Sequence, residues 1–550
     1  MSPTGRPEGE HRSAPHEGNP LSPKGRPEGE HRSAQQEDNS LSVVAAFLLG
    51  AATVFGFAPF ELSGVPLLAL ALLLLLWQGA LPGRAAQLGF AFGLGLFGAG
   101  VSWVYVALNT FGGMPLPLAA VATAGFCAYL ALFPALAGWL ATRWTPAHSW
   151  SRALAGAAAW TLAEWARSVV FTGFPWLSLG YAQIVREGAT PLAGIAPVGG
   201  VFAVTLAGAL VSAALALAIP AVAGGAWRRA GLCVAGALAM PLAGALIDRA
   251  EWTRPLHPVS VSLLQGNVTQ DRKFDPQFRQ DTFDLYSELV TVSRGRLIVL
   301  PESAFQVFSD EVPDAVLLHL LRTAAARDGD VLLGLFTVEP PLPGGGLRYY
   351  NSVLSLGANE LQLYRKRHLV PFGETIPADA VLGWFIRNVL SIPLANQSAG
   401  SPDQPPLKVA GQAVAVNICY EDAFGADIRT QAAAATLLVN VTNDAWYGRS
   451  LAALQHNQIA AMRAKETGRT LLRATNTGIT SAIGHDGREL ARLPWFTRGI
   501  LEIDVVGREG LTPYVRAGDA PAAALAALLL VVAAFAGRHR NAVTTARPAA

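Results

Sequence analysis

Long apolar stretches alternate with short polar loops from Leu41 to Ile247, and one more apolar stretch lies near the end of the chain. Each is close to the roughly 20 residues that a helix needs to cross a bilayer. The pattern predicts a multi-pass α-helical membrane domain with about eight crossings. The predicted spans are 42–60, 64–81, 87–108, 115–141, 151–170, 196–220, 229–247 and 519–537.

A different pattern occupies residues 255–510, where short apolar runs alternate with helix-like stretches such as Asp314–Arg327 and Leu454–Gly468. Continuous runs of Val, Ile and Leu are typical of buried strands, and their alternation with helices predicts an α/β domain. The predicted strands lie at 259–267, 296–302, 331–338, 352–357, 414–421, 435–444 and 480–484.

The polar ends and the loop charges predict the domain order and the orientation. The segment SPTGRPEGEHRSA at Ser2 recurs as SPKGRPEGEHRSA at Ser22, and such a polar repeat cannot bury enough apolar surface to fold. Alternate loops carry the arginines, so the positive-inside rule puts both termini in the cytoplasm and the α/β domain outside it. The predicted domains are a disordered cytoplasmic tail at 1–40, a seven-helix membrane domain at 41–250, the α/β domain at 255–510, a C-terminal transmembrane helix at 519–537 and a cytoplasmic tail at 538–550.

Composition agrees with a membrane protein and narrows the chemistry. Hydrophobic residues make up 51% of the chain and charged residues only 15%. The net charge of +2 argues against a nucleic-acid partner. The three cysteines are far apart and no His/Cys cluster accompanies them, so no metal site is predicted. Cys127 and Cys233 lie in apolar stretches and are expected to be buried. Cys419 lies instead in the polar region, where an unpaired thiol indicates a functional role.

Three residues at or near strand ends can together carry chemistry: Glu302, Lys366 and Cys419. Each alone has an ordinary alternative, as a capping carboxylate, a solvated cation or a buried core thiol. Together, the carboxylate can take the proton of the thiol, and the ammonium can lower the thiol pKa and stabilise an oxyanion. This combination predicts a cysteine nucleophile.

Motifs around these residues resemble a known family. PES (301–303), YRKRHLVPFGE (364–374), NICYED (417–422) and NDAWYG (443–448) resemble the nitrilase superfamily with its Glu-Lys-Cys triad. Combined with the membrane stretches and with RATNTGIT and GLTPYVR, they resemble the apolipoprotein N-acyltransferases over residues 42–537. The resemblance implies that the α/β domain is an αββα sandwich on the periplasmic side of the bacterial inner membrane.

The resemblance also implies the reaction and the partners. A membrane phospholipid, typically phosphatidylethanolamine, donates an acyl chain to the cysteine as a thioester. The N-terminal α-amine of an S-diacylglyceryl-cysteine apolipoprotein then takes the chain as an amide. No cofactor is implied, and nothing in the sequence demands more than a monomer.

The same resemblance assigns roles to residues. Glu302 is the general base, Lys366 the oxyanion partner and Cys419 the nucleophile, while Glu374 is a second glutamate near the triad and the N–H of Tyr420 completes the oxyanion hole. Glu421, Phe274 and Trp446 are further supporting or substrate-binding positions. The family usually has tryptophan where Phe274 stands, and phenylalanine keeps the aromatic surface but loses the indole N–H, which bears on the preference for the donor chain.

Charged and aromatic residues within the membrane stretches leave two alternatives open. Glu164 and Arg167 are three residues apart, so they can pair along one helix face or line a lipid entry. Trp176, at the end of FTGFPW, can be an interfacial anchor or part of a lateral substrate gate.

Two other functions compete with acyl transfer. A membrane-anchored amidase of the nitrilase type needs the same triad, but a hydrolase of soluble substrates needs one anchor rather than eight crossings. A transporter or scaffold with an inert nitrilase-like domain has no need to retain all three of Glu302, Lys366 and Cys419.

Overall fold

In the computed structural model, every predicted apolar stretch is largely helical. The structure describes residues 28–273, 275–340, 347–375 and 396–545. The helices that contain the apolar stretches are α1 (Glu28–Thr53), α2 (Gly64–Gln78), α3 (Pro82–Gly100), α4 (Val104–Val106), α5 (Leu116–Arg143), α6 (Trp150–Arg167), α7 (Ala196–Ala223), α8 (Trp227–Ile247) and α16 (Ala520–Thr545).

Length and hydropathy select a smaller set of candidate membrane spans within the described residues. Four helices are long and apolar enough to cross a membrane, and a fifth is added if the bent pair Pro82–Gly100 and Val104–Phe111 counts as one span. The four are Leu116–Arg143, Pro191–Ala223, Trp227–Ile247 and Ala520–Arg538.

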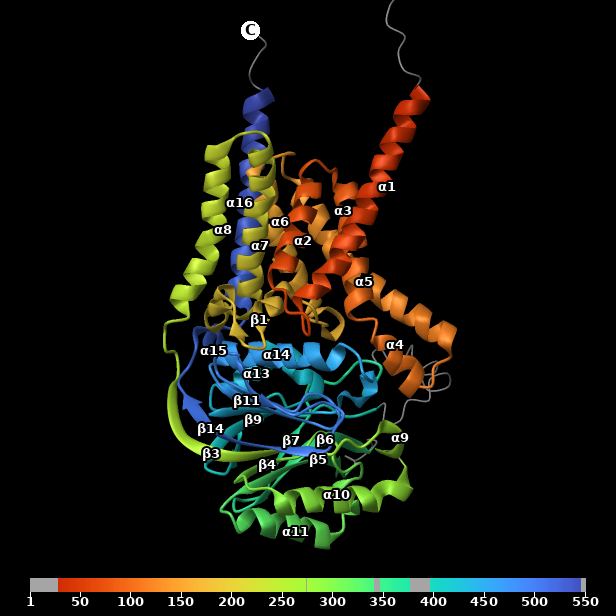
Figure 1. Cartoon of the computed structure of the whole chain (residues 1–550), viewed down its shortest axis with the longest axis vertical. Helices are drawn as coiled ribbons and strands as arrows, with labels where there is room; N and C mark the ends of the chain where they lie inside the picture. Colours follow the sequence, from red (N-terminus) through yellow and green to blue (C-terminus); the bar gives the residue numbers. More distant parts are fainter. Residues whose placement is uncertain (1–27, 274, 341–346, 376–395, 546–550) are drawn as a thin grey trace, which may run out of the picture. The chain divides into compact units, whose positions relative to one another are not determined.

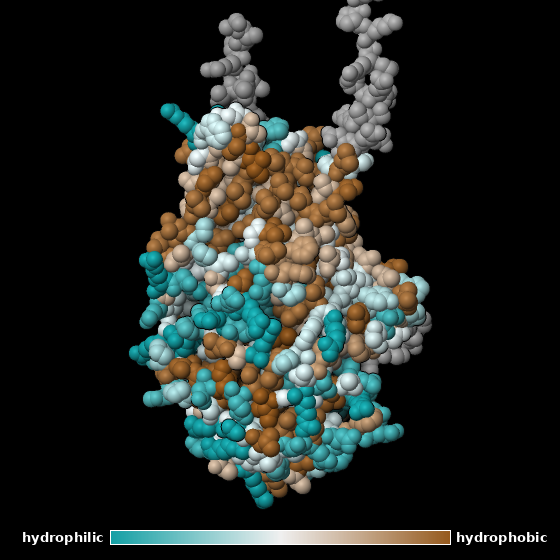
Figure 2. Space-filling view, viewed as in Figure 1, coloured by the Kyte–Doolittle hydropathy of each residue, from teal (hydrophilic) through white to brown (hydrophobic). Residues whose placement is uncertain are grey.

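Figure 2 shows hydrophobic side chains gathered over the helical part, whereas hydrophilic ones prevail around the strands. Exposed apolar residues such as Leu232 on α8 are what a lipid-facing helix requires. Cys233 also lies on α8 and is only half-buried, whereas the sequence predicts that it is buried.

The α/β domain contains two six-stranded sheets. The first has the order β14-β3-β4-β5-β6-β7 and the second the order β13-β12-β11-β10-β9-β8. In each sheet three adjacent strands run parallel, β3-β4-β5 and β9-β10-β11, and antiparallel strands complete the edges. The strands are β3 (Arg254–Gln265), β4 (Leu297–Val299), β5 (Asp330–Glu339), β6 (Arg348–Gly357), β7 (Gln362–Arg365), β8 (Leu407–Val409), β9 (Gln412–Ile418), β10 (Leu437–Thr442), β11 (Thr470–Thr475), β12 (Ser481–Ile483), β13 (Glu489–Arg492) and β14 (Gly499–Glu509).

Both faces of the central strands of the first sheet are buried. Along β4, Leu297 and Val299 belong to the core that includes the second sheet, whereas Ile298 belongs to a separate cluster with side chains of α10 (Arg279–Val292) and α11 (Asp314–Ala325). Successive strand residues point to opposite faces, so one face meets the second sheet and the other meets the two helices. Figure 1 shows α10 and α11 on the side of the first sheet away from the membrane helices.

The second sheet faces the membrane helices through α13 (Gly425–Ala432) and α14 (Ala452–Thr467). Helix α14 is mostly buried although it contains many polar residues, because it lies between the sheet and α7. Its Glu466 accepts a hydrogen bond of 2.5 Å from the N–H of Val201, next to a kink in α7 at Gly199 and Gly200. The second sheet is therefore joined to the helical domain through α14, which packs directly on α7.

All seven predicted strands are present, but several elements were missed. The predicted helices at 314–327 and 454–468 are α11 and α14. Strands β7, β8, β11, β13 and β14 and helices α10 and α13 were not predicted. Some of these, such as β14, alternate exposed and buried residues at a sheet edge and carry charged side chains, which hides the apolar pattern.

Candidate active site

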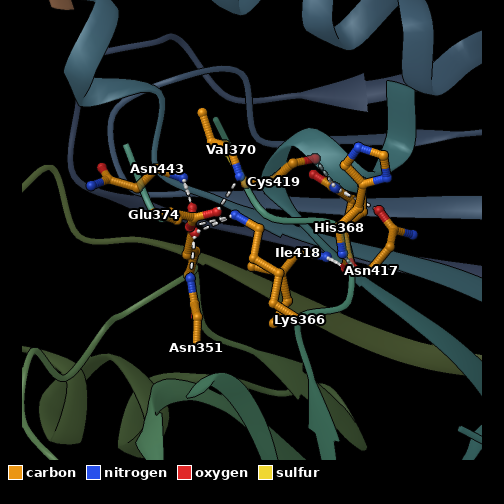
Figure 3. Close-up of polar contacts among 12 residues, drawn as sticks. Asn351, Lys366, His368, Val370, Glu374, Asn417, Ile418, Cys419 and Asn443 are labelled. Atoms are coloured by element: carbon orange, nitrogen blue, oxygen red, sulfur yellow. Dashed lines mark hydrogen bonds and ion pairs between the residues drawn. The ribbon is translucent and has the colours of Figure 1, made fainter. Parts of the chain in front are cut away.

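The structure brings Glu302, Lys366 and Cys419 together at the ends of strands from both sheets. Glu302 follows β4, Lys366 follows β7 and Cys419 follows β9. The Nζ atom of Lys366 lies 3.5 Å from Oε1 of Glu302. Both of these groups act electrostatically on Cys419, and all three side chains are buried. The three candidates therefore lie in one buried polar cluster, part of which is drawn in Figure 3.

Neutral donors fix the carboxylate of Glu302. Its Oε1 accepts a hydrogen bond of 2.8 Å from Nδ2 of Asn351, and its Oε2 accepts one of 2.9 Å from the N–H of Asn443. Because each oxygen accepts a bond from a fixed donor, the orientation of the carboxylate is fixed.

Lys366 lies between two carboxylates. Its Nζ donates to Oε1 of Glu374 at 2.7 Å, and Oε2 of Glu374 accepts from the N–H of Val370 at 2.8 Å (Figure 3). Burial lowers the pKa of Lys366, but Glu374, Glu302 and the thiolate form of Cys419 raise it more, so its pKa lies well above the usual range. Lys366 is therefore an ammonium group at neutral pH.

Cys419 has a strained backbone and a protonated thiol. Its φ is +54°, in the left-handed region that residues other than glycine rarely adopt. Burial raises the pKa of the thiol, Glu302 raises it further and Lys366 lowers it, and the pKa lies well above the usual range. The thiol thus carries its proton at neutral pH and needs a base to become a nucleophile.

Glu421 connects the Cys419 turn to the segment that carries Lys366. Its carboxylate accepts hydrogen bonds from the N–H groups of Ile418, Arg367 and His368 at 2.6, 2.7 and 3.0 Å. Burial raises the pKa of Glu421, and these N–H groups and Lys366 offset only part of the rise. Glu421, predicted as a supporting residue, therefore fixes the backbone next to Cys419 and the backbone next to Lys366.

Two more predicted residues have definite places, and one lies outside the described residues. Tyr420 donates from its hydroxyl to the carbonyl of Gly173 at 2.8 Å, which ties the Cys419 turn to a loop of the helical domain. Trp446 is half-buried, with its ring edge-on to Phe111 at a centroid distance of 6.3 Å. Phe274 is not among the described residues.

The charged residues of α6 hold that same loop. Although both side chains are described, no ion pair within 4.0 Å joins Glu164 to Arg167, so the two groups attract one another electrostatically without a direct contact. Arg167 instead donates to the carbonyls of Phe174 and Trp176 at 2.5 and 2.7 Å, and Glu164 accepts from the N–H of Leu179 at 3.0 Å. Buried loop carbonyls and N–H groups need such partners when no strand or helix supplies them.

Trp176 contacts the α/β domain rather than the surface. It is 3% exposed, donates from Nε1 to Oε1 of Gln455 on α14 at 2.8 Å and stacks on Tyr420 with a centroid distance of 6.4 Å. The alternative of an exposed interfacial anchor is therefore corrected, because the ring is enclosed on all sides.

Sequence reasoning missed several buried polar residues around the cluster. Lys273 donates to the carbonyl of Glu302 at 3.2 Å, and burial lowers its pKa to about 8 against the raising effects of Glu302 and Cys419. Other missed residues are Asn351, Asn440, Asn443, Asp422, Asp444, His456 and Arg473. A signal did exist for Asn440 and Arg473, because each is a polar residue inside an otherwise apolar strand run.

Comparison with known proteins first defines the class. The model of the carbon-nitrogen hydrolase family matches residues 261–514, which contain both sheets and the buried cluster. The α/β domain is therefore a carbon-nitrogen hydrolase domain, and its nitrilase-like fold agrees with the prediction.

The helical part and the full-length relatives then define the family. The model described as the apolipoprotein N-acyltransferase N-terminal domain matches residues 49–214. Apolipoprotein N-acyltransferase of Nitrosomonas europaea is 49% identical, covering 91% of this chain and 99% of its own length. The namesakes from Chromobacterium violaceum and Methylococcus capsulatus are 41% and 43% identical, each covering 91% of this chain and 94% and 97% of their own lengths. The chain belongs to the apolipoprotein N-acyltransferase family.

Proposed function

We propose that this enzyme transfers a fatty acyl chain from a membrane phospholipid to the N-terminal α-amine of S-diacylglyceryl-cysteine apolipoproteins, through a thioester on Cys419. The observation that carries the proposal is the buried cluster in which a protonated thiol lies with an oriented carboxylate and an ammonium. Relatives that bear the acyltransferase name and cover nine-tenths of the chain support the choice of transfer over hydrolysis.

In the first half-reaction, Glu302 takes the proton from Cys419, and the sulfur forms a bond to the ester carbonyl carbon of the phospholipid. The carbonyl oxygen becomes an oxyanion, which Lys366 and the N–H of Tyr420 stabilise. The carbon–oxygen bond to the glycerol then breaks, and Glu302 returns the proton to the leaving alkoxide. The products are a lysophospholipid and acyl-Cys419. Glu374 holds the Lys366 ammonium in place throughout.

In the second half-reaction, the neutral α-amine of the lipoprotein attacks the thioester carbon. The same two groups stabilise the new oxyanion, and Glu302 accepts a proton from the nitrogen. The carbon–sulfur bond then breaks and Glu302 passes this proton to the sulfur, so that Cys419 leaves as the thiol. A thioester keeps much of the reactivity of the ester, so the amide forms without a cofactor. Both substrates stay in the bilayer, which avoids a desorption cost of about 0.8 kcal/mol for each CH₂ removed from lipid.

The finer features of the enzyme belong to the same proposal. We place it in the bacterial inner membrane as a monomer with eight crossings, the shorter apolar helices included, and with the α/β domain as a periplasmic αββα sandwich. The proposed divisions are 1–40, 41–250, 255–510, 519–537 and 538–550. The preferred donor is phosphatidylethanolamine. The arginine-bearing loops and the four to five candidate spans support this arrangement.

The test is to incubate the purified full-length enzyme with phosphatidylethanolamine vesicles and no acceptor. We expect a stable acyl adduct at Cys419, identified by peptide mass spectrometry, together with one equivalent of lysophospholipid. Addition of a diacylglyceryl lipopeptide with a free α-amine should discharge the adduct as an amide. Cys419→Ala should give neither adduct nor lysophospholipid, whereas Cys233→Ala on the half-buried α8 position should behave as the unaltered enzyme.

The competing amidase function predicts a different result. An amidase would hydrolyse small amides faster than it consumes phospholipid, and no acyl adduct would accumulate in the absence of an acceptor. Either observation would overturn the proposal.

A further inference from the structure

A row of buried polar residues crosses the second sheet behind the nucleophile. Asn417, Asn440 and Arg473 are register partners on the adjacent parallel strands β9, β10 and β11. Such partners point to the same face of a sheet. All three are at most 4% exposed, and Asn417 is two residues before Cys419. Burying polar side chains in a sheet core costs free energy unless they have hydrogen-bond partners. The partners of this row therefore indicate its function.

The orientation of Asn440 is imposed by Arg473. Nη1 of Arg473 donates to Oδ1 of Asn440 at 2.7 Å, and an arginine can only donate. The amide nitrogen of Asn440 must therefore face the other way, where it donates to Oδ1 of Asn417 at 2.6 Å and to the backbone carbonyl of Cys419 at 3.1 Å.

His456 of α14 reaches the same carbonyl. Its Nε2 lies 2.6 Å from Oδ1 of Asp422 and 3.2 Å from the Cys419 oxygen, and its Nδ1 lies 3.0 Å from Oδ1 of Asp444. All of these neighbours are acceptors, so both ring nitrogens carry a hydrogen and the ring is an imidazolium. The direction of its pKa agrees: burial and Arg473 lower the pKa of His456, but Asp422 and Asp444 raise it more.

The charges of this group cancel. Arg473 also contacts Asp422 at 2.6 Å and Asp444 at 3.4 Å, so two cations face two carboxylates in a fully buried setting. Paired and hydrogen-bonded charges of this kind are rigid, because moving any one of them leaves a buried charge without a partner. The Cys419 carbonyl is thus held by donors that cannot easily reorient.

The held carbonyl determines where the next N–H points. The peptide between Cys419 and Tyr420 is planar, and in its usual trans form the C=O and the N–H point in opposite directions. Tyr420 lies in the first turn of the short helix Cys419–Ala423, where N–H groups have no partner within the helix. We propose that Asn440 and His456 are positioning residues that clamp the Cys419 carbonyl and thereby aim the Tyr420 N–H at the developing oxyanion. The inference rests on the proposed acyl transfer, in which that N–H stabilises the oxyanion.

The test compares two reactions of the same thiol in Asn440→Ala. Acylation by phospholipid passes through an oxyanion, whereas alkylation by iodoacetamide displaces iodide and forms none. We expect the single-turnover acylation of Cys419 to fall about 100-fold, the usual effect of losing or misaligning one oxyanion donor. Alkylation at its high-pH plateau, measured on the Cys419 peptide by mass spectrometry, should change less than about twofold.

Asn457→Ala is the matched control. Asn457 lies on α14, and its amide contacts Glu489 and Ser481 rather than the Cys419 turn. Both reactions should stay at the level of the unaltered enzyme in this variant. Asn440→Asp is a second test variant, because it keeps an acceptor for Arg473 while it removes the donor to Cys419. Should Asn440→Ala fail to fold, the expectation passes to Asn440→Asp.

The possible outcomes separate the clamp from the proposed function. Acylation and alkylation that fall in parallel, or acylation that is unchanged, would overturn the clamp. If the unaltered enzyme forms no acyl-Cys419 from phospholipid, the proposed function fails instead, and the clamp is then judged by acylation with p-nitrophenyl butyrate against the same alkylation rate.

Discussion

At the residue scale, the proposed chemistry depends on a cysteine, Cys419, whose environment disfavours its own thiolate. Burial and Glu302 both raise the pKa of Cys419, and Lys366 offsets only part of this effect. A preformed thiolate is therefore absent at neutral pH, and the base must act at the moment of attack. This arrangement protects a thiol that lies outside the cytoplasm in the proposed topology, because thiolate is the form that oxidants attack.

Glu302→Gln is expected to make the Cys419 thiol more acidic and yet to slow its acylation. The substitution removes a negative charge that raises the pKa of Cys419, so the pH midpoint of Cys419 alkylation should move to lower pH. Acylation by phospholipid should nevertheless fall by about 100-fold or more, because the general base is gone. The measurements are iodoacetamide rates across pH and single-turnover acylation.

Glu288→Gln is the control for that change, since Glu288 is 66% exposed and pairs with Arg498 on the surface. It should move neither quantity. An alkylation midpoint that stays in place or rises in Glu302→Gln would contradict the electrostatic argument.

At the scale of elements, strand β5 sets the position of Glu302, the proposed base. A Cβ atom on Gly334 of β5 would lie 2.3 Å from the carbonyl oxygen of Pro301, 2.8 Å from the nitrogen of Ser303 and 3.0 Å from the Cα of Glu302. The backbone that carries Glu302 can approach β5 only because this position has no side chain. Residues of α6, away from the cluster, also position a side chain. Arg167 and Glu164 hold the loop that contains Trp176, and the ring of Trp176 stacks on Tyr420.

Gly334→Ala is accordingly expected to push the Glu302 segment away from Cys419. A displacement of about 1 Å would reduce acylation roughly 100-fold, and the overpacking would lower stability by about 1–3 kcal/mol. Single-turnover acylation and thermal unfolding in detergent measure the two effects. Gly98→Ala on α3 is the comparison, because a Cβ there has nothing within 4 Å. Equal behaviour of the two variants would show that β5 does not position the base.

At the scale of the whole molecule, the helical and catalytic domains meet at a kink in α7. Gly200 has φ +70° and ψ −170°, and a Cβ there would lie 2.3 Å from the ring of Tyr514 on α15 (Pro513–Ala517). The neighbouring Val201 N–H is bound by Glu466 of α14. The kink thus lets a membrane helix and two helices of the catalytic half share one close contact.

Gly200→Ala should loosen this junction. Alanine is strained at that φ and clashes with an aromatic ring, so we expect the unfolding free energy to fall by about 2 kcal/mol or more. Gly236→Ala on α8, where a Cβ has nothing within 4 Å, should change it by less than about 1 kcal/mol. Thermal unfolding of both variants in the same detergent decides the matter, and an unchanged melting temperature for Gly200→Ala would refute the role given to the kink.

Much of the candidate site was predictable because its residues interrupt or follow apolar runs. Cys419 stands directly after a buried strand and Glu302 shortly after another, and strand ends gather functional groups whatever the details of packing. The register row Asn417, Asn440 and Arg473 was visible only as isolated polar residues. Their common function depends on which strands are neighbours and in what register, and neither is encoded locally.

The sequence by itself determined the apolar helices, the predicted strands and the identity of the three candidate residues, because hydrophobic periodicity and strand-end chemistry are local properties. Only the tertiary structure decided the raised pKa of Cys419, the separate partners of Glu164 and Arg167, and the enclosure of Trp176. Burial, electrostatic neighbours and hydrogen-bond partners come from segments that are hundreds of residues apart, as with Trp176 and Gln455, and the fold alone brings these together.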